Sequence, residues 1–460
     1  MKIQYVSICP TESAKQNECY ALTPELLAAT GARYSRNNEG LDAIVSKIDF
    51  SNTDKSVDGI FKMVDYGHAS IADMAPLALF IDDISLFAAY FLWTIAPTAG
   101  GQECSTRYIK LDGGSVVDDD ILGIPEDLKL EYWKYVEKSF QSYELALQYW
   151  TSFGVLHPEL TKIPSSLLSS SSDKDKKQVA RMMRNYAFDR ARVYLPLSAM
   201  TGVMMVQSAR AWANMSAHLQ SHSLRELNII GKEIEEKLKI GAPRLVKHCR
   251  ATDAIKDFYS FENNFEKKYC KMKNKFLPSS NQCDTSLKVH SNKKIDLEAL
   301  SFRTNRYSPF GHTISQIPVT FSWEGITFGE IRDLNRHRTG SKYCSLVPIG
   351  FYGSTDQIPN DESELCEKIN LLHSNFSQTS EIARDLMSKN PEYVYFTSLG
   401  HKYYFEHTTT VDKFIYEMEL RTGVGAHYKY AEHCHKMLDL WYQKYPHTKG
   451  LIFEGSAEPE

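Results

Sequence analysis

The stretch Arg336-His337-Arg338-Thr339-Gly340-Ser341 follows an amphipathic run from Ile326 to Asn335. Apolar residues recur at helical spacing along this run, which predicts a helix that reaches the basic triplet and ends at Gly340 in a left-handed C-cap. Successive helical residues point about 100° apart, so the three side chains would surround an extended anion such as a pyrophosphate. The alternative is a solvated helix end whose positive charges suit the negative pole of the helix dipole.

The residues before this run add a second feature. Gly311-His312 is followed by alternating apolar residues over 317–323, a pattern typical of a strand. The order Gly-His, strand, helix, Arg-His-Arg resembles the flavin-dependent thymidylate synthases (the ThyX family), whose signature is Arg-His-Arg-x-x-Ser followed by Glu-x-Ser-x-Arg. Ser341 stands where this signature has its Ser. The second element is absent here, because its three positions are occupied by Cys344, Leu346 and Pro348.

An internal repeat supplies the missing element in the first half of the chain. Gly67-His68 leads into an alternating apolar run over 77–81, a probable helix over 86–93 and then the segment Gln102–Tyr108. This segment carries the family's Glu-x-Ser-x-Arg, as Glu103, Ser105 and Arg107. No Lys, Arg or second His lies between His68 and Arg107, so the first half has no Arg-His-Arg. Each half therefore keeps the element that the other has lost.

The repeat predicts an α+β fold with two tandem ThyX-like domains, each a small sheet packed with long helices. We expect an N-terminal domain over 1–250 with a mobile Ser-rich insertion at about 162–177, a linker over 251–299, and a C-terminal domain over 300–460. The linker contains a basic cluster at 267–275. This cluster is either a patch for RNA or phosphates or, as we favour, a solvated helix.

Composition narrows the class of protein. With 460 residues, 42% of them hydrophobic, the chain can bury the cores of two to three domains. A net charge of -4 gives no overall footprint for nucleic acid. The nine cysteines include no Cys-x-x-Cys pair, which favours reduced thiols over disulfides or a zinc site. No apolar stretch reaches the ~18 residues that span a bilayer, so we expect a soluble protein. The cysteine pattern leads us to expect a cytoplasmic protein without a bound metal.

Further motifs complete the resemblance in the first half. Arg192-Val-Tyr-Leu-Pro is similar to a family element whose Arg contacts the substrate nucleotide. Arg210 and Asn214 are spaced i and i+4 on a predicted helix, and their spacing matches a flavin-binding Arg and Asn of the family. Without the other motifs, an Arg paired with a neighbouring acid and a capped Asn would be the better interpretation.

The second half diverges in a complementary way. A predicted helix over 409–422 ends in Glu419-Leu420-Arg421, and Arg421 is the nucleotide-contacting Arg that the first half lacks, where His218-Leu219 stands instead. Conversely, Asp412 and Tyr416 replace the flavin-facing Arg and Asn of the first half.

The resemblance implies a flavin-dependent enzyme. Sites of this family are shared between subunits of a tetramer, so we expect a homodimer of fused chains, a pseudo-tetramer, with one composite site built from both halves. The implied catalytic residues are Arg421 and His68. The implied FAD ligands are Ser70, Arg210, Asn214, Arg336, His337 and Arg338. The implied nucleotide ligands are Glu103, Ser105, Arg107 and Arg192.

The implied reaction is transfer of a one-carbon unit to a pyrimidine nucleotide monophosphate, such as dUMP to dTMP, with methylenetetrahydrofolate and NADPH as co-substrates. Two alternatives stay open: modification such as hydroxymethylation of another pyrimidine nucleotide, and a non-catalytic nucleotide-binding scaffold. Cys104, inside the nucleotide motif, could act as a thiolate nucleophile, although an inert cysteine is the more common state.

Overall fold

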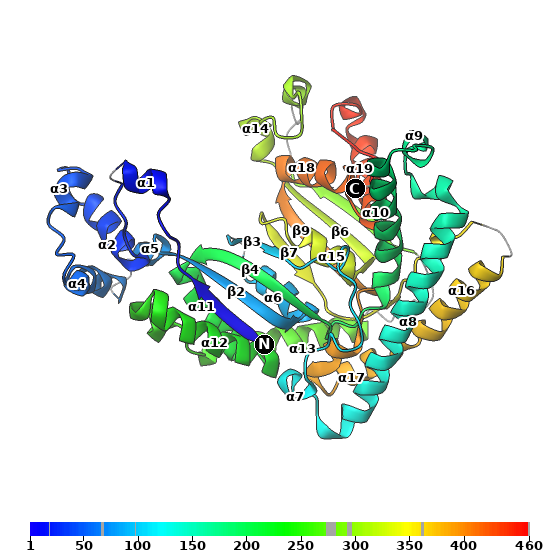
Figure 1. Cartoon of the computed structure of the whole chain (residues 1–460), viewed down its shortest axis with the longest axis horizontal. Coiled ribbons are helices and arrows are strands. Elements are labelled where there is room, and N and C mark those ends of the chain that lie inside the picture. The colour runs from blue at the N-terminus through cyan, green and yellow to red at the C-terminus, as the bar shows by residue number, and fades with distance from the viewer. Residues whose placement is uncertain are drawn as a thin grey trace. The chain divides into compact units, whose positions relative to one another are not determined.

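The computed structural model describes residues 1–17, 19–65, 69–96, 98–272, 282–291, 297–359 and 363–458, without the side chains of 63–65 and 265–272 (Figure 1). These residues form two compact units. The first unit comprises Met1–Cys104, Val116–Ile124 and Met200–Asn264. The second unit comprises Ser105–Ser115, Pro125–Ala199 and Phe265–Glu460.

The first unit is organised around a four-stranded antiparallel sheet with the order β1-β2-β4-β3. Its strands are β1 (Lys2–Val6), β2 (Pro76–Ser85), β3 (Gly100–Glu103) and β4 (Met200–Ser208). Its helices are α1 (Glu12–Gln16), α2 (Pro24–Tyr34), α3 (Leu41–Val45), α4 (Thr53–Asp65), α5 (Ser70–Asp73), α6 (Leu86–Thr94), α7 (Asp119–Leu122), α11 (Ala209–Ser221) and α12 (Arg225–Gly241). The alternation predicted for the first half is present in β2, where Leu77, Leu79 and Ile81 are buried.

The second unit repeats this strand order as β5-β6-β9-β7, with β8 paired to β9. Its strands are β5 (Asp284–Val289), β6 (Pro318–Thr327), β7 (Ser341–Cys344), β8 (Gly350–Phe351) and β9 (His401–Thr410). Each sheet places a long bulged strand before a short helix, namely β2 before α6 and β6 before α15 (Phe328–Leu334). Each last strand, β4 or β9, continues directly into a helix, α11 or α18 (Val411–Thr422). The matching topologies confirm the predicted α+β fold with a tandem arrangement.

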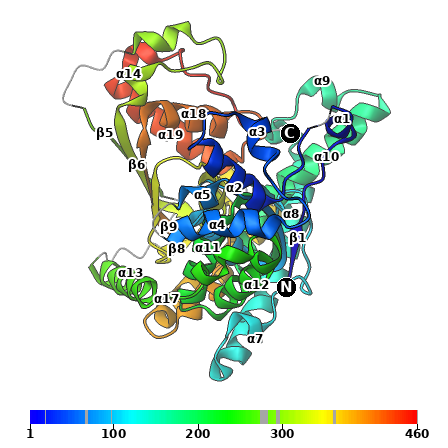
Figure 2. The same ribbon diagram turned by 90° about the vertical axis from the view of Figure 1, so that its left-hand side faces the viewer.

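The second unit also contains helices of four to 28 residues. They are α8 (Lys129–Leu156), α9 (Ser165–Leu168), α10 (Asp173–Ala191), α14 (His312–Ser315), α16 (Glu364–Ser377), α17 (Thr379–Met387) and α19 (Tyr428–Lys444). The helices α8 and α10 pack side by side, and α18 packs along α19 (Figures 1 and 2). The packing helices are amphipathic: α8 buries Tyr132, Phe140 and Trp150 on one face.

The compact units divide the chain differently from the sequence repeat. Residues 125–199 group with the C-terminal residues, although the sequence places them in the first repeat. The boundaries 1–250 and 300–460 therefore stay a proposal about the repeat. Part of the expected mobile insertion at 162–177 is helical, since it contains α9 and the start of α10.

The expected linker over 251–299 contains regular structure. It holds α13 (Asp253–Met272) and β5, which pairs with β6 along its whole length. The side chains of the basic cluster at 267–275 lie outside the described residues.

The helix before the basic triplet is shorter than the sequence predicted. The helix α15 begins after Thr327, whose hydroxyl accepts from the backbone N–H of Glu330 in a capping box, and it ends at Leu334. The triplet therefore lies in the turn that leads to β7. Gly340 does have a left-handed φ of 73°, but it serves this turn: a Cβ there would lie 2.1 Å from the carbonyl oxygen of Thr408.

Within the described residues, no helix is long and apolar enough to cross a membrane.

Candidate functional site

Four arginines gather around two buried aspartates in the second unit. Asp189 lies in the last turn of α10, Asp333 lies in the last turn of α15, and both are buried. The four arginines are Arg107, Arg192, Arg336 and Arg421. We call these six residues the arginine cluster. Turns and helix ends of both sequence halves supply its members.

Arg107 is held at two edges of its guanidinium group. Its Nε and Nη2 donate to the two carboxylate oxygens of Asp189, each at 2.7 Å, and its Nη1 donates to the carbonyl oxygen of Gly425 at 2.7 Å. This bidentate geometry fixes the plane of the group. Burial raises the pKa of Asp189, but Arg107, His427 and Arg192 together lower it further, so the pKa falls to about 2. Asp189 is therefore ionised at neutral pH.

Asp333 joins the remaining arginines. Its Oδ2 lies 3.3 Å from Nη2 of Arg192 and its Oδ1 lies 3.5 Å from Nη2 of Arg336, while its backbone carbonyl accepts from Nη2 of Arg421. Burial raises the pKa of Asp333, but the surrounding guanidinium groups hold it well below its usual range. Four positive charges thus face two carboxylates. Such an excess of charge suits an anion with two negative charges.

A hydrogen bond to His337 fixes the orientation of Arg421. Its Nε donates to Nε2 of His337 at 2.7 Å. Burial lowers the pKa of His337 to about 3, so the ring is neutral at pH 7 and can accept this hydrogen bond. Behind the ring lies the buried carboxylate of Glu417, 4.0 Å from His337 and 3.0 Å from His407. The sequence predicted His337 as a flavin ligand, whereas here its side chain supports Arg421.

The nucleotide motif of the first half runs from one unit to the other. Glu103 ends β3 in the first unit. The hydroxyl of Ser105 accepts from the backbone N–H of Arg107 at 3.2 Å, which helps to shape the turn that carries this arginine. The neighbouring Thr106 accepts from Nη1 of Arg192 at 3.4 Å. Cys104 is an exposed free thiol.

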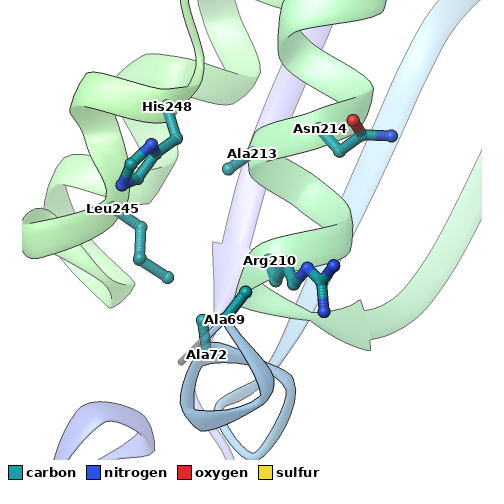
Figure 3. A pocket seen from close by; sticks show the side chains of 7 residues that line it. All are labelled: Ala69, Ala72, Arg210, Ala213, Asn214, Leu245 and His248. Atoms are coloured by element: carbon teal, nitrogen blue, oxygen red, sulfur yellow. The ribbon is translucent and has the colours of Figure 1, made fainter. Parts of the chain in front are cut away.

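The expected flavin ligands of the first half surround a cavity in the first unit. Arg210 and Asn214 lie on one face of α11, with α5 nearby and with Leu245 and His248 on a neighbouring segment (Figure 3). The cavity has a volume of about 210 Å³. Nη1 of Arg210 lies 2.9 Å from a carboxylate oxygen of Asp73, and both side chains are about half exposed.

Other expected site residues have different surroundings. Ser70, the first residue of α5, is exposed and lies between two alanines that line the cavity. Arg338 is exposed on the turn before β7. His68 lies outside the described residues.

The second unit has a cavity at the equivalent place between α14 and α18. Its volume is about 540 Å³, and its walls include Arg306, Asp412 and Tyr416. Asp412 and Tyr416 stand at the positions that Arg210 and Asn214 hold on α11, counted from the strand end. An acidic group and an aromatic ring thus replace two polar donors. The two cavities therefore present different chemistry to a ligand.

The sequence missed the acidic members of the site. Asp189 and Asp333 belong to no motif that we used. One signal was present: Asp333 lies three residues before Arg336, a spacing that allows an ion pair on a helix. Glu417 likewise lies one helical turn before Arg421. His433 and His435, two residues apart in α19, have separate carboxylate partners, Glu330 and Glu454. Among the described residues, the acidic group that could hold a metal ion is Asp118–Asp120, and exposed carboxylates of this kind are common without a metal.

The chain thus combines a tandem α+β fold with a cluster of four arginines whose chemistry suits an anion. Comparison with known proteins narrows this class. Residues 19–244 match the family model described as "Thymidylate synthase complementing protein". A UPF0159 protein of Chlamydia pneumoniae is 25% identical over 241 residues, which are 47% of this chain and 43% of that protein. Residues 19–244 are thus ThyX-like, and the chain matches less than half the length of this relative.

A solved structure is also similar in part. The UMP/dUMP methylase PolB from Streptomyces cacaoi, bound with 5-Br dUMP, aligns with 54% of this chain and 93% of its own, at 15% identity and a TM-score of 0.32. A similarity this low carries no inference for this chain.

Proposed function

We propose that the arginine cluster binds the phosphate of a pyrimidine nucleotide monophosphate, and that the protein transfers a one-carbon unit to that nucleotide with the help of a flavin. The observation that carries the proposal is the convergence of Arg107 and Arg192, from the first half, with Arg336 and Arg421, from the second, around Asp333. The match to the family model supports the class of reaction.

The donor geometry suits a phosphate. A guanidinium group has five N–H donors, and the described contacts of Arg107 use three of them, two for Asp189 and one for Gly425. The carboxylates fix the guanidinium planes, so little side-chain entropy is lost when an anion binds. Charge-assisted hydrogen bonds to a phosphate are among the stronger ones that a protein can make.

The cavity beside Arg210 and Asn214 fits one end of a flavin dinucleotide. Its walls combine a cationic group, an amide and the imidazole of His248, which can donate to phosphate or to ring carbonyl oxygens. Its volume of about 210 Å³ is too small to enclose a whole drug-sized ligand, since such pockets reach roughly 300–1,000 Å³. A bound flavin would supply hydride chemistry. NADPH and methylenetetrahydrofolate stay predictions from the resemblance.

Arg421 is our candidate for the catalytic group. His337 and the carbonyl of Asp333 hold its Nε and Nη2, so the guanidinium group is positioned before a nucleotide arrives. A fixed positive charge next to a pyrimidine ring would stabilise negative charge that develops on the ring during activation. The network of His337, Glu417 and His407 would prevent the group from turning away.

The test is a product assay with the purified protein. We expect dUMP, methylenetetrahydrofolate, NADPH and FAD together to give a nucleotide with an added methyl group, identified by mass spectrometry. A hydroxymethyl product, or turnover of another pyrimidine nucleotide, would select the first alternative. Tight nucleotide binding with no product under any of these conditions would leave the scaffold alternative and contradict an enzymatic role.

A further inference from the structure

A third cavity lies in the first unit, and the proposed function gives it no role. Its walls come from the C-terminal end of α2, from α3, from the turns that follow these two helices, and from α4. The helix α2 packs against both α3 and α4 (Figures 1 and 2). The cavity has a volume of about 330 Å³. None of its residues belongs to the arginine cluster or lines the cavity beside Arg210.

The charged side chains that line this cavity are cations. They are Arg33, Arg36 and Lys47, and no aspartate or glutamate is among the described residues of the lining. Nη2 of Arg33 and Nη1 of Arg36 each donate to a backbone carbonyl oxygen. Within the described part of the chain, neither arginine pairs with a carboxylate. Lys47 pairs with Glu39 at the surface, where both side chains are about half exposed or more.

The described carboxylates of α2 and α4 are held by a different arginine. Nη2 of Arg244 lies 2.8 Å from a carboxylate oxygen of Asp54, and its Nε lies 2.6 Å from one of Asp58. Its Nη1 pairs with Glu25. Because these three acids are already engaged, they do not offset the positive charge of the two arginines at the cavity.

The cavity also offers an unpaired donor and an apolar surface. Nη1 of Arg33 is buried and makes no hydrogen bond with the described residues. A buried donor of this kind is unfavourable until an acceptor is supplied, by water or by a ligand. The apolar lining includes Ile44 and Ile48, which are 2% and 8% exposed, and Ile60.

We propose that this cavity binds an organic phosphate monoester. The phosphate contacts Arg33 and Arg36, because the donor fork of a guanidinium group matches the oxygens of a phosphate. The organic part packs on the isoleucines, which removes apolar surface from water. The volume of about 330 Å³ lies at the lower end of the roughly 300–1,000 Å³ of small-molecule pockets, so the ligand is small.

The test is hydrogen–deuterium exchange of the whole protein with phenyl phosphate, in the presence of FAD and dUMP so that the other proposed anion sites are filled. We expect slower exchange of the backbone amides over 32–48 and 53–62. Half-maximal protection should need about tenfold less phenyl phosphate than inorganic phosphate, since the ring buries apolar surface. Because the readout is local, it does not depend on whether the arginine cluster binds a nucleotide.

A pair of variants assigns the effect to the cavity. Arg36→Ala should raise the phenyl phosphate concentration for half-maximal protection about tenfold or more, because a charge-assisted hydrogen bond is lost. Arg36 is exposed just beyond the end of α2, so its replacement leaves the fold intact. Lys55→Ala is the matched control, since Lys55 is an exposed cation of α4 that does not line the cavity.

Three results would overturn the proposal. One is unchanged exchange over 32–48 at millimolar phenyl phosphate. Another is protection by phenol or by inorganic phosphate at the same concentration as by phenyl phosphate, which would remove the role of the arginines or of the isoleucines. The third is equal protection of the native protein and of a folded Arg36→Ala variant.

Discussion

Asp189 and Asp333 reduce the electrostatic repulsion between the four arginines when no ligand is bound. Guanidinium groups that are buried near one another repel, and each carboxylate offsets part of that repulsion. The two aspartates also leave an excess of positive charge, which a bound phosphate would neutralise. At the level of single residues, the charges of these arginines and aspartates therefore determine both the stability of the folded protein and the binding of an anion.

Removal of one buried carboxylate should lower the stability of the folded protein. We expect Asp189→Asn to lower the free energy of unfolding by about 3–5 kcal/mol, because Arg107 is left as an uncompensated buried charge. Asp73→Asn is the matched control: its partner Arg210 is about half exposed, and such surface pairs are worth at most about 1 kcal/mol. Urea denaturation of both variants measures the difference. Equal losses would show that the burial of Asp189 has no energetic consequence.

The stability difference between the native protein and Asp189→Asn should depend on pH. The pKa of Asp189 is depressed from 3.8 to about 2 in the folded protein, so its stabilising contribution is complete above pH 4 and is lost as the pH falls toward 2. Between pH 5 and pH 3, the stability difference between native protein and Asp189→Asn should shrink by about 1 kcal/mol. Urea denaturation at the two pH values tests this. A difference that stays constant or grows would contradict it.

The site was only half predictable from the sequence. Arg107, Arg192, Arg336 and Arg421 stand in spaced motifs, and the structure places all four in one cluster. Asp189 and Asp333 could not be found in this way, because an isolated aspartate carries no spacing signal and its partner is 82 or 141 residues away. His337 shows a second limit: the motif predicted a flavin ligand, and only the structure shows that its ring accepts a hydrogen bond from Arg421.

At the level of elements, each sheet has a hydroxyl N-cap that binds a buried glutamate at the point where its long strand meets a helix. Ser85 caps α6 and binds both oxygens of the buried Glu226, while Thr327 caps α15 and binds Glu330. The acid comes from a different helix in the first unit and from the same helix in the second. The strand and helix periodicities predicted these elements, but not where α15 ends or that β5 exists, because both depend on pairing with distant strands.

Removal of the caps should destabilise the two units alike. We expect Thr327→Ala and Ser85→Ala each to lower the free energy of unfolding by about 0.5–2 kcal/mol, the usual cost of a lost N-cap. The buried acids Glu330 and Glu226 also lose one donor each. Thr327→Ser and Ser85→Thr keep the hydroxyl and should cost much less. A loss in only one of the two units, measured by urea denaturation, would show that the caps are not equivalent.

At the level of the whole molecule, the tandem lets two copies of one fold diverge. One copy keeps Arg210 and Asn214 beside its cavity, and the other has Asp412 and Tyr416. Asp412 is paired with Lys413 at 3.3 Å, and Arg306 also lines the second cavity, so this cavity keeps positive charge but lacks the arginine and asparagine pair of the first. We expect the loss of this pair to leave one cofactor site per chain without a change of fold. The predicted homodimer would then carry one flavin for each chain.

The flavin stoichiometry tests this asymmetry. We expect the purified protein, saturated with FAD and then desalted, to retain about one flavin per chain by absorbance. Arg210→Ala should weaken flavin binding about tenfold or more, since one charge-assisted hydrogen bond is worth about 1.5–3 kcal/mol. Lys413→Ala, at the wall of the other cavity, should have no effect. Retention of two flavins per chain would contradict the asymmetry.

The binding of a nucleotide phosphate by the arginine cluster is tested most directly by calorimetric titration with dUMP and with deoxyuridine, which lacks the phosphate. We predict that dUMP binds at least about a hundredfold more tightly, because the phosphate gains two or more charge-assisted hydrogen bonds. In a folded Arg107→Ala variant, dUMP should lose most of this advantage while deoxyuridine binds as before. Equal affinities of the two ligands for the native protein, or an unchanged dUMP affinity in Arg107→Ala, would contradict a phosphate site at this cluster.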